Sequence, residues 1–154
     1  MASVDLLTAL PSLLPKAIAW AETQEAQALH EGRQLTDLEL ALARSVGVRQ
    51  PNLIRIALSQ QLPMPLDPDL RAAALHTGLL GPGMVGLTLG YGIYVVAGYG
   101  TPRLISHECR HVHQYETAGS IAAFLPSYLE QVIRFGYTSA PFEADARSWE
   151  RDQP

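Results

Sequence analysis

Two histidines spaced four residues apart, with a glutamate after the first, are the residues of this sequence best suited to chemistry. His107, Glu108 and His111 follow the pattern His-Glu-x-x-His. On an α-helix, residues four apart lie on one face, so both imidazoles can bind one Zn²⁺. Glu108 is offset by about 100° from His107, which places its carboxylate beside the metal, where it can accept a proton from water. The pattern therefore predicts two zinc ligands and the general base of a hydrolase.

A catalytic zinc needs a third protein ligand, and the acidic residues after His111 are the candidates. Glu116 lies on the same helix but about 140° further round, so it faces elsewhere. Glu143 opens a later helix that could fold back and bring its carboxylate over the metal. The alternative is a first-turn glutamate that only stabilises its own helix. Asp145 is the reserve ligand, or an acceptor for an imidazole N–H.

Two residues near the motif, Arg110 and His113, depart from stricter versions of this signature, which have uncharged and apolar residues there. A chance match on an amphipathic helix is therefore the alternative to a metal site. The neighbouring Ile105 and Val112 are apolar, which indicates a buried helix, and buried histidines require partners. This favours the zinc site. His113 and Cys109 point away from the metal face, and Cys109 is expected to be a small buried hydrophobe.

The region from residue 84 to 147 resembles the small gluzincin-type zinc metallopeptidases. The resemblance rests on the run HECRHVHQYE from His107, on the pair GY at Gly136, and on the run PFEADA from Pro141. In that group the HExxH helix is followed by a glutamate ligand on a separate helix, often within an E-x-E-A-like run. Here the second acidic position is Asp145. The run TLGYGI from Thr88 is similar to the edge-strand segment that precedes the motif helix in such domains.

The resemblance implies a zinc peptidase that acts on a peptide or protein. By analogy, His107, His111 and Glu143 bind the Zn²⁺. Glu108 is the general base, which accepts a proton from the attacking water.

Two further expectations concern the substrate. Many such enzymes have a Tyr or His donor for the oxyanion, and Tyr137 is the candidate; a tyrosine packed beside the metal helix is the alternative. An extended peptide could pair with the predicted strand 92–97, if that strand is an exposed edge.

The elements that must position these residues follow from apolar periodicity and from capping residues. We expect helices over residues 12–31, 36–47, 102–117, 120–135 (with a break or kink at Pro126) and from 141 onward. Strands are expected over 52–58, 84–89 and 92–97, while 70–75 fits a strand or a short helix.

This order predicts one α+β domain over residues 1–154: a minimal zincin-like fold with a small, mostly antiparallel sheet against the HExxH helix and additional N- and C-terminal helices. Residues 1–50 form a helical part, 51–100 the sheet, and 101–150 the metal-site helices. No repeat or linker divides the chain.

The composition of the chain limits the kinds of partner and the location that we expect for this protein. The formal net charge is −4 and the basic residues are scattered, which argues against a nucleic-acid partner. Residues 72–102 carry no charge, but they hold eight glycines, which favours a buried sheet over stable insertion in a membrane. The N-terminus has no basic region typical of a signal peptide and the chain has one cysteine, so we expect a cytoplasmic protein.

Two functions are compatible with the sequence. The first is a zinc metallopeptidase of minimal size, favoured by the intact Glu108, because a purely structural zinc site needs no base. The second is a non-catalytic, metal-stabilised interaction module, favoured by a length of 154 residues, which leaves little room for a deep cleft.

Overall fold

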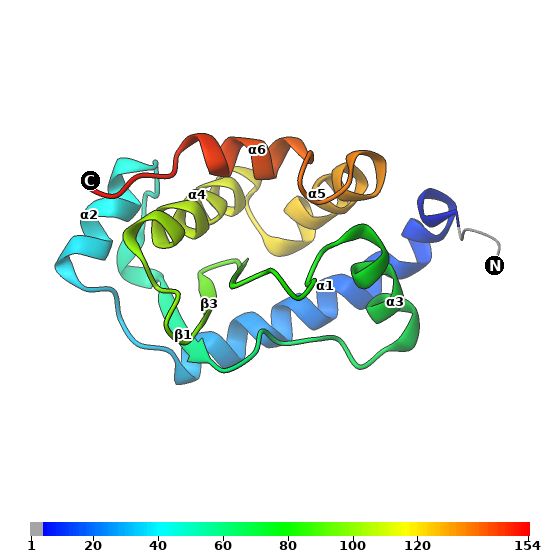
Figure 1. Cartoon of the computed structure of the whole chain (residues 1–154). Helices are drawn as coiled ribbons and strands as arrows, with labels where there is room; N and C mark the ends of the chain where they lie inside the picture. Colours follow the sequence, from blue (N-terminus) through cyan, green and yellow to red (C-terminus); the bar gives the residue numbers. More distant parts are fainter. Residues whose placement is uncertain (1–4) are drawn as a thin grey trace.

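A small mixed sheet lies between helices at the centre of the molecule (Figure 1). The computed structural model describes residues 5–154 and has three strands, β1 (Arg55–Ser59), β2 (Gly86–Leu89) and β3 (Gly92–Val96). Their order is β1-β3-β2, with β3 parallel to β1 and antiparallel to β2. The α+β class is confirmed. The sheet is mixed rather than mostly antiparallel, because a long crossover that contains α3 (Pro68–Thr77) joins β1 to the other two strands.

The strand that was expected to accept a substrate peptide is not at the edge of the sheet. β3 is bonded to β1 on one side and to β2 on the other. The two residues Gly90 and Tyr91 connect β2 to β3, and Gly90 has φ +63°, as a tight hairpin turn requires. The condition for pairing a peptide with 92–97, that this strand is an exposed edge, is therefore not met. β2 is the edge strand on this side.

The helical prediction is confirmed for most elements; the structure decides one segment that was left open and corrects the start of the first helix. Residues 70–75, which fit either a strand or a short helix by their sequence, lie in α3, because the Asp67 side chain caps its first turn. The first helix begins at Leu6 rather than at residue 12, since Asp5 accepts hydrogen bonds from the backbone N–H groups of Leu7 and Thr8. The helices are α1 (Leu6–Glu31), α2 (Asp37–Ser45), α3, α4 (Pro102–Ala118), α5 (Ile121–Phe135) and α6 (Pro141–Ser148), with a 3₁₀ turn, η1 (Pro51–Leu53), ahead of β1.

The sheet separates two apolar clusters. Tyr94 of β3 and Leu87 of β2 belong to the cluster that α1 and α5 cover, whereas Ile93 and Val95 belong to the cluster beneath α2 and α4. Alternate residues of one strand thus face opposite layers, as the period of two requires. In Figure 1, α1 runs along one side of the sheet, and α4 and then α6 lie on the other.

No helix within residues 5–154 is long and apolar enough to cross a membrane. The uncharged stretch 72–102 contributes most of α3 and the whole of β2 and β3 instead.

Glu116, which the helical geometry turned away from the metal, has a structural role near the end of α4. Its carboxylate accepts hydrogen bonds from the backbone N–H groups of Arg49 (2.8 Å) and Gln50 (3.0 Å) and from the Tyr91 hydroxyl (2.9 Å). It therefore ties α4 to the loop after α2 and to the β2–β3 turn.

We expect Glu116→Ala to lower the free energy of unfolding by about 1–3 kcal/mol, because two backbone donors and a phenol lose their acceptor. Urea denaturation measures the change. Glu130→Ala is the matched control, since this exposed glutamate only pairs with Arg134 one turn away and such pairs contribute about 0.3–0.5 kcal/mol. Equal losses in the two variants would contradict this role for Glu116.

Candidate metal centre

Two imidazoles of α4 and one carboxylate of α6 meet in a buried cluster. His107 Nε2 lies 3.3 Å from Glu143 Oε1, and His111 Nε2 lies 3.0 Å from Glu143 Oε2. One ligand atom from each residue lies within 4.8 Å of the others, close enough to bind one metal ion. The three residues that the sequence predicted as ligands are therefore brought together.

The third residue reaches the cluster because α6 folds back over α4. Pro141 stands in the first turn of α6, where its missing N–H costs no hydrogen bond, and Glu143 follows two residues later. The Phe142 N–H is bonded to Gln131 Oε1 of α5, and the Phe142 carbonyl accepts from Gln114 of α4. These contacts fix the start of α6, and the Glu143 side chain is only 2% exposed.

Each imidazole is oriented by an acceptor on its outer nitrogen. His107 Nδ1 lies 2.8 Å from Glu150 Oε2, and His111 Nδ1 lies 2.8 Å from Gln114 Oε1. When each Nδ1 carries the hydrogen, each Nε2 is free to bind a metal, as in most histidine metal sites. Sequence reasoning missed both acceptors. Gln114 could have been found from its spacing of three after His111 on one helix, but no local signal marks Glu150, which follows the end of α6.

Asp145 is not a ligand in this arrangement, which corrects its assignment as the reserve. Its carboxylate pairs with Arg110 Nε at 2.8 Å and accepts from Gln114 Nε2 at 2.9 Å. It therefore acts on His111 only through Gln114. Arg110 also donates to the Val46 carbonyl, so its side chain points away from the metal ligands and the unusual residue at this position does not disturb them.

The Glu108 carboxylate lies beside the ligands and is held from the sheet. The Thr88 hydroxyl of β2 lies 2.9 Å from Glu108 Oε1, and Glu108 Oε2 lies 3.9 Å from His107 Nε2. Gly86 leaves the space that this side chain fills, since a Cβ there would lie 2.9 Å from Glu108 Oε2. The edge strand thus positions the predicted base.

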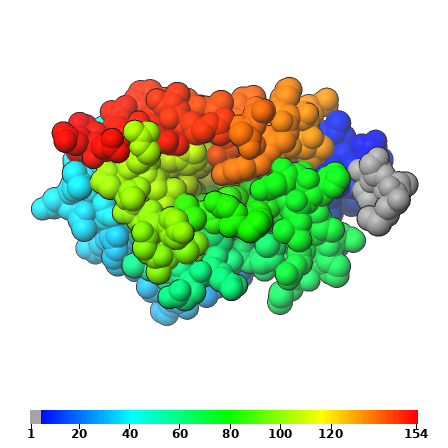
Figure 2. Space-filling model, viewed as in Figure 1, coloured from blue at the N-terminus to red at the C-terminus, as the bar shows by residue number. Residues whose placement is uncertain are grey.

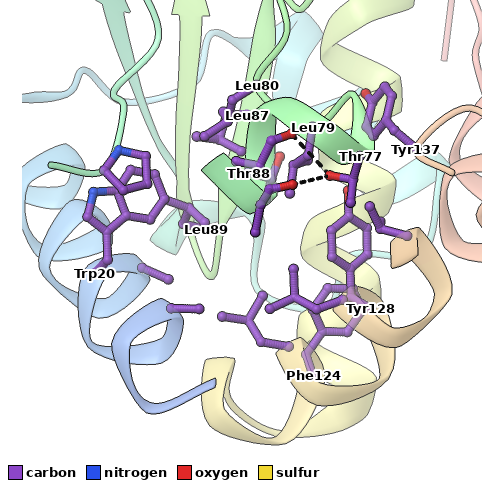
Figure 3. A pocket seen from close by; sticks show the side chains of 18 of the residues that line it. Trp20, Thr77, Leu79, Leu80, Leu87, Thr88, Leu89, Phe124, Tyr128 and Tyr137 are labelled. Carbon is purple, nitrogen blue, oxygen red and sulfur yellow. Dashed lines mark hydrogen bonds between the residues drawn. The ribbon is translucent and has the colours of Figure 1, made fainter. Parts of the chain in front are cut away.

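Two tyrosines of the C-terminal part of the chain lie near Glu143, and both are labelled in Figure 3. The Tyr128 hydroxyl of α5 donates to Glu143 Oε2 at 2.8 Å, a site contact that sequence reasoning missed because Tyr128 fits the apolar face of its helix. Tyr137 lies on the turn between α5 and α6, and its N–H is bonded to the Thr77 carbonyl of α3. Burial and the carboxylates of Glu143 and Glu108 raise the pKa of Tyr137, so it stays a hydrogen-bond donor at neutral pH.

The electrostatics of the cluster favour a bound cation. Burial opposes the charge of His107, but the hydrogen bond to Glu143 and the charge of Glu108 outweigh it and raise the pKa of His107 to about 9. The same carboxylates raise the pKa of His111 despite its burial. Burial also disfavours the charged Glu143, yet the two imidazoles hold the pKa of this carboxyl far below its usual range. Two nitrogens and an ionised carboxylate are a donor set typical of zinc.

An apolar cavity opens next to this cluster (Figure 3). It encloses about 110 Å³ between α1, α3, β2 and α5, and Glu108, His111 and Glu143 form part of its wall. On the surface, the segment around α3 and β2, green in Figure 2, lies against the orange and red C-terminal helices.

Cys109 and His113 point away from the candidate ligands, as expected, and like Trp149 they have structural roles. Cys109 is fully buried in the apolar cluster of α2 and α4, and this burial raises the pKa of its thiol. His113 Nδ1 lies 2.9 Å from the Gly47 carbonyl, away from the ligands. Trp149 stacks under the Arg110 guanidinium at 4.3 Å.

Comparison of the chain with protein-family models, with curated proteins and with solved structures found no match.

We expect the affinity for Zn²⁺ to rise with pH between 6 and 9. Because the metal-free His107 has a pKa of about 9, its Nε2 carries a proton at neutral pH that the metal must displace. The affinity should increase about tenfold per pH unit for each displaced proton and level off above pH 9. Competition with a chelator of known protonation constants measures it. An affinity independent of pH over this range would contradict the raised pKa.

Proposed function

We propose that this protein is a zinc-dependent peptidase of the gluzincin type. The observation that supports the proposal most strongly is the convergence of His107, His111 and Glu143 from two helices, next to the carboxylate of Glu108. Glu108 is outside the ligand set, as a base must be if it is to accept and release a proton. The hydrogen bonds around the cluster hold the two histidines, Glu143 and Glu108 in the orientations that these roles require.

A bound Zn²⁺ would polarise the scissile carbonyl and make the attacking water more acidic. The residues of the chain do the rest. Glu108 accepts a proton from the water and later donates it to the leaving amine, and the Thr88 hydroxyl keeps its carboxylate in one orientation. Tyr137 donates a hydrogen bond to the oxygen of the carbonyl under attack. Tyr128 holds Glu143 in place.

β2 is the strand along which a substrate peptide would lie. It has a partner strand on one side only, and Thr88, in its middle, contacts Glu108. An extended peptide added to this edge would bring a backbone carbonyl close to the base. We therefore propose that the substrate peptide pairs with β2 rather than with β3.

The alternative, a non-catalytic module stabilised by the metal, makes a different use of the same ligands. It needs the His-His-Glu cluster but neither Glu108 nor the Thr88 contact. A variant that changes Glu108 alone separates the two functions.

We expect Glu108→Gln to bind about one zinc per chain, like the wild type, and to hydrolyse peptides about 10²–10⁴-fold more slowly, because the amide cannot accept the proton. Metal analysis and a screen of fluorogenic peptides give the two readouts. His111→Ala is the control that should lose zinc. Undiminished hydrolysis in Glu108→Gln would exclude Glu108 as the base, and zinc binding without any hydrolysis by the wild type would favour the module.

The two tyrosines should separate catalysis from metal binding. We expect Tyr137→Phe to lower kcat about 10²-fold with zinc affinity unchanged, since it removes one donor to the developing oxyanion. Tyr128→Phe should instead weaken zinc binding about 10–100-fold, because Glu143 loses the donor that orients it. Rate and affinity are measured on both variants. If Tyr137→Phe weakened zinc binding and Tyr128→Phe lowered kcat alone, the two tyrosines would have the opposite roles.

A further inference from the structure

We propose that the apolar cavity beside the metal centre receives a bulky apolar side chain of the peptide, next to the bond that is cleaved. The inference rests on the proposed function and names its substrate class. Glu108, His111 and Glu143 form part of the cavity wall, so a group bound there lies against the reacting atoms.

The chemistry of the wall selects an apolar group. Leucines, alanines and aromatic residues make up most of it, the majority of them from α1, α3, β2 and α5, and the described lining residues include no Lys, Arg or Asp. Three hydroxyl groups of the wall are already used: Thr77 is bonded to carbonyls of α3 (dashed lines in Figure 3), Thr88 to Glu108, and Tyr115 to the Thr88 carbonyl. A charged side chain would find no partner there, except at the metal end.

Part of the cavity wall comes from segments before residue 84, outside the zincin resemblance, and this part is specific to this chain. Trp20 and Ala17 come from α1, and Ala74 comes from α3. The segment between α3 and β2 contributes Leu80, whose φ of +59° is a left-handed conformation that costs a leucine free energy. Protein interiors are normally packed without cavities of this size. A strained residue such as Leu80 persists only where the surrounding structure holds it in place. A hollow that ends at the metal ligands is suited to a substrate group.

The test uses two zinc-binding probes that differ in their apolar group, acetohydroxamate and 3-phenylpropanohydroxamate, with zinc-loaded protein and calorimetry. Both probes bind the metal by the same group, and only the second has a phenyl group for the cavity. We expect the phenyl compound to bind at least about tenfold more tightly. Equal affinities would overturn the proposal, whether or not the protein cleaves peptides.

Two alanines of α1 provide a matched pair of variants. Ala17 lines the cavity, whereas Ala26 is exposed on the same helix. Ala17→Leu fills the cavity and should abolish most of the phenyl preference, while Ala26→Leu should keep it. A preference that survives unchanged in a zinc-loaded Ala17→Leu would place the phenyl group elsewhere and overturn the proposal.

A metal-free measurement covers the case in which Ala17→Leu does not fold. Toluene added to metal-free protein should change the emission of Trp20, which lies at the cavity (Figure 3); the change should be lost in Trp20→Phe and kept in Trp149→Phe. No change up to the solubility of toluene would overturn the proposal. Hydrolysis is measured separately with peptides that carry Phe, Ala or Asp beside the scissile bond. If none is cleaved while the phenyl preference holds, the peptidase function fails and the apolar site stands.

Discussion

The burial of charge between α4 and α6 is the constraint on which the site depends. Glu143 is almost completely enclosed, and a carboxylate in that position is tolerated only when cationic or hydrogen-bonding groups surround it. Here His107, His111 and Tyr128 do so. A bound divalent cation would satisfy the same group more fully, because it brings a positive charge to a point where nitrogen and oxygen atoms already converge.

The rest of the structure holds these groups in place from several directions. Glu150 and Gln114 orient the two imidazoles, and Gln114 is itself fixed by Asp145 and the Phe142 carbonyl. On the opposite side, β2 supplies the Thr88 hydroxyl and the space at Gly86 that set the position of Glu108. The layers therefore divide the candidate site between them: the sheet positions the proposed base Glu108, α4 carries the two histidines, and α6 carries the proposed third ligand.

The same layers of helices and sheet also form the apolar cavity beside the cluster. Residues of α1, α3, β2 and α5 line a cavity of about 110 Å³, and Glu108, His111 and Glu143 form part of its wall, so the apolar core is not closed beside the cluster. A polar centre joined to an apolar cavity is the general form of a small-molecule or side-chain binding site, in which a few polar groups orient a ligand that apolar walls bind.

Local sequence patterns predicted most of the elements and the three residues of the candidate metal cluster. The spacing of His107 and His111 places both on one helical face, Pro102 and Gly119 delimit their helix, and Pro141 marks the start of the helix that carries Glu143. These inferences held because helix periodicity and capping act within a few residues. The start of α1 was placed too late because an earlier cap, Asp5, was overlooked.

Only the tertiary structure decided the strand order, the outer contacts and the cavity. Which strand is the edge depends on the crossover from β1, so β3 is the central strand and β2 is the edge strand beside Glu108. Glu150 reaches His107 over 43 positions of sequence, and Tyr128 reaches Glu143 from another helix. No spacing rule covers such contacts, because they arise from the packing of whole elements rather than from the geometry of one.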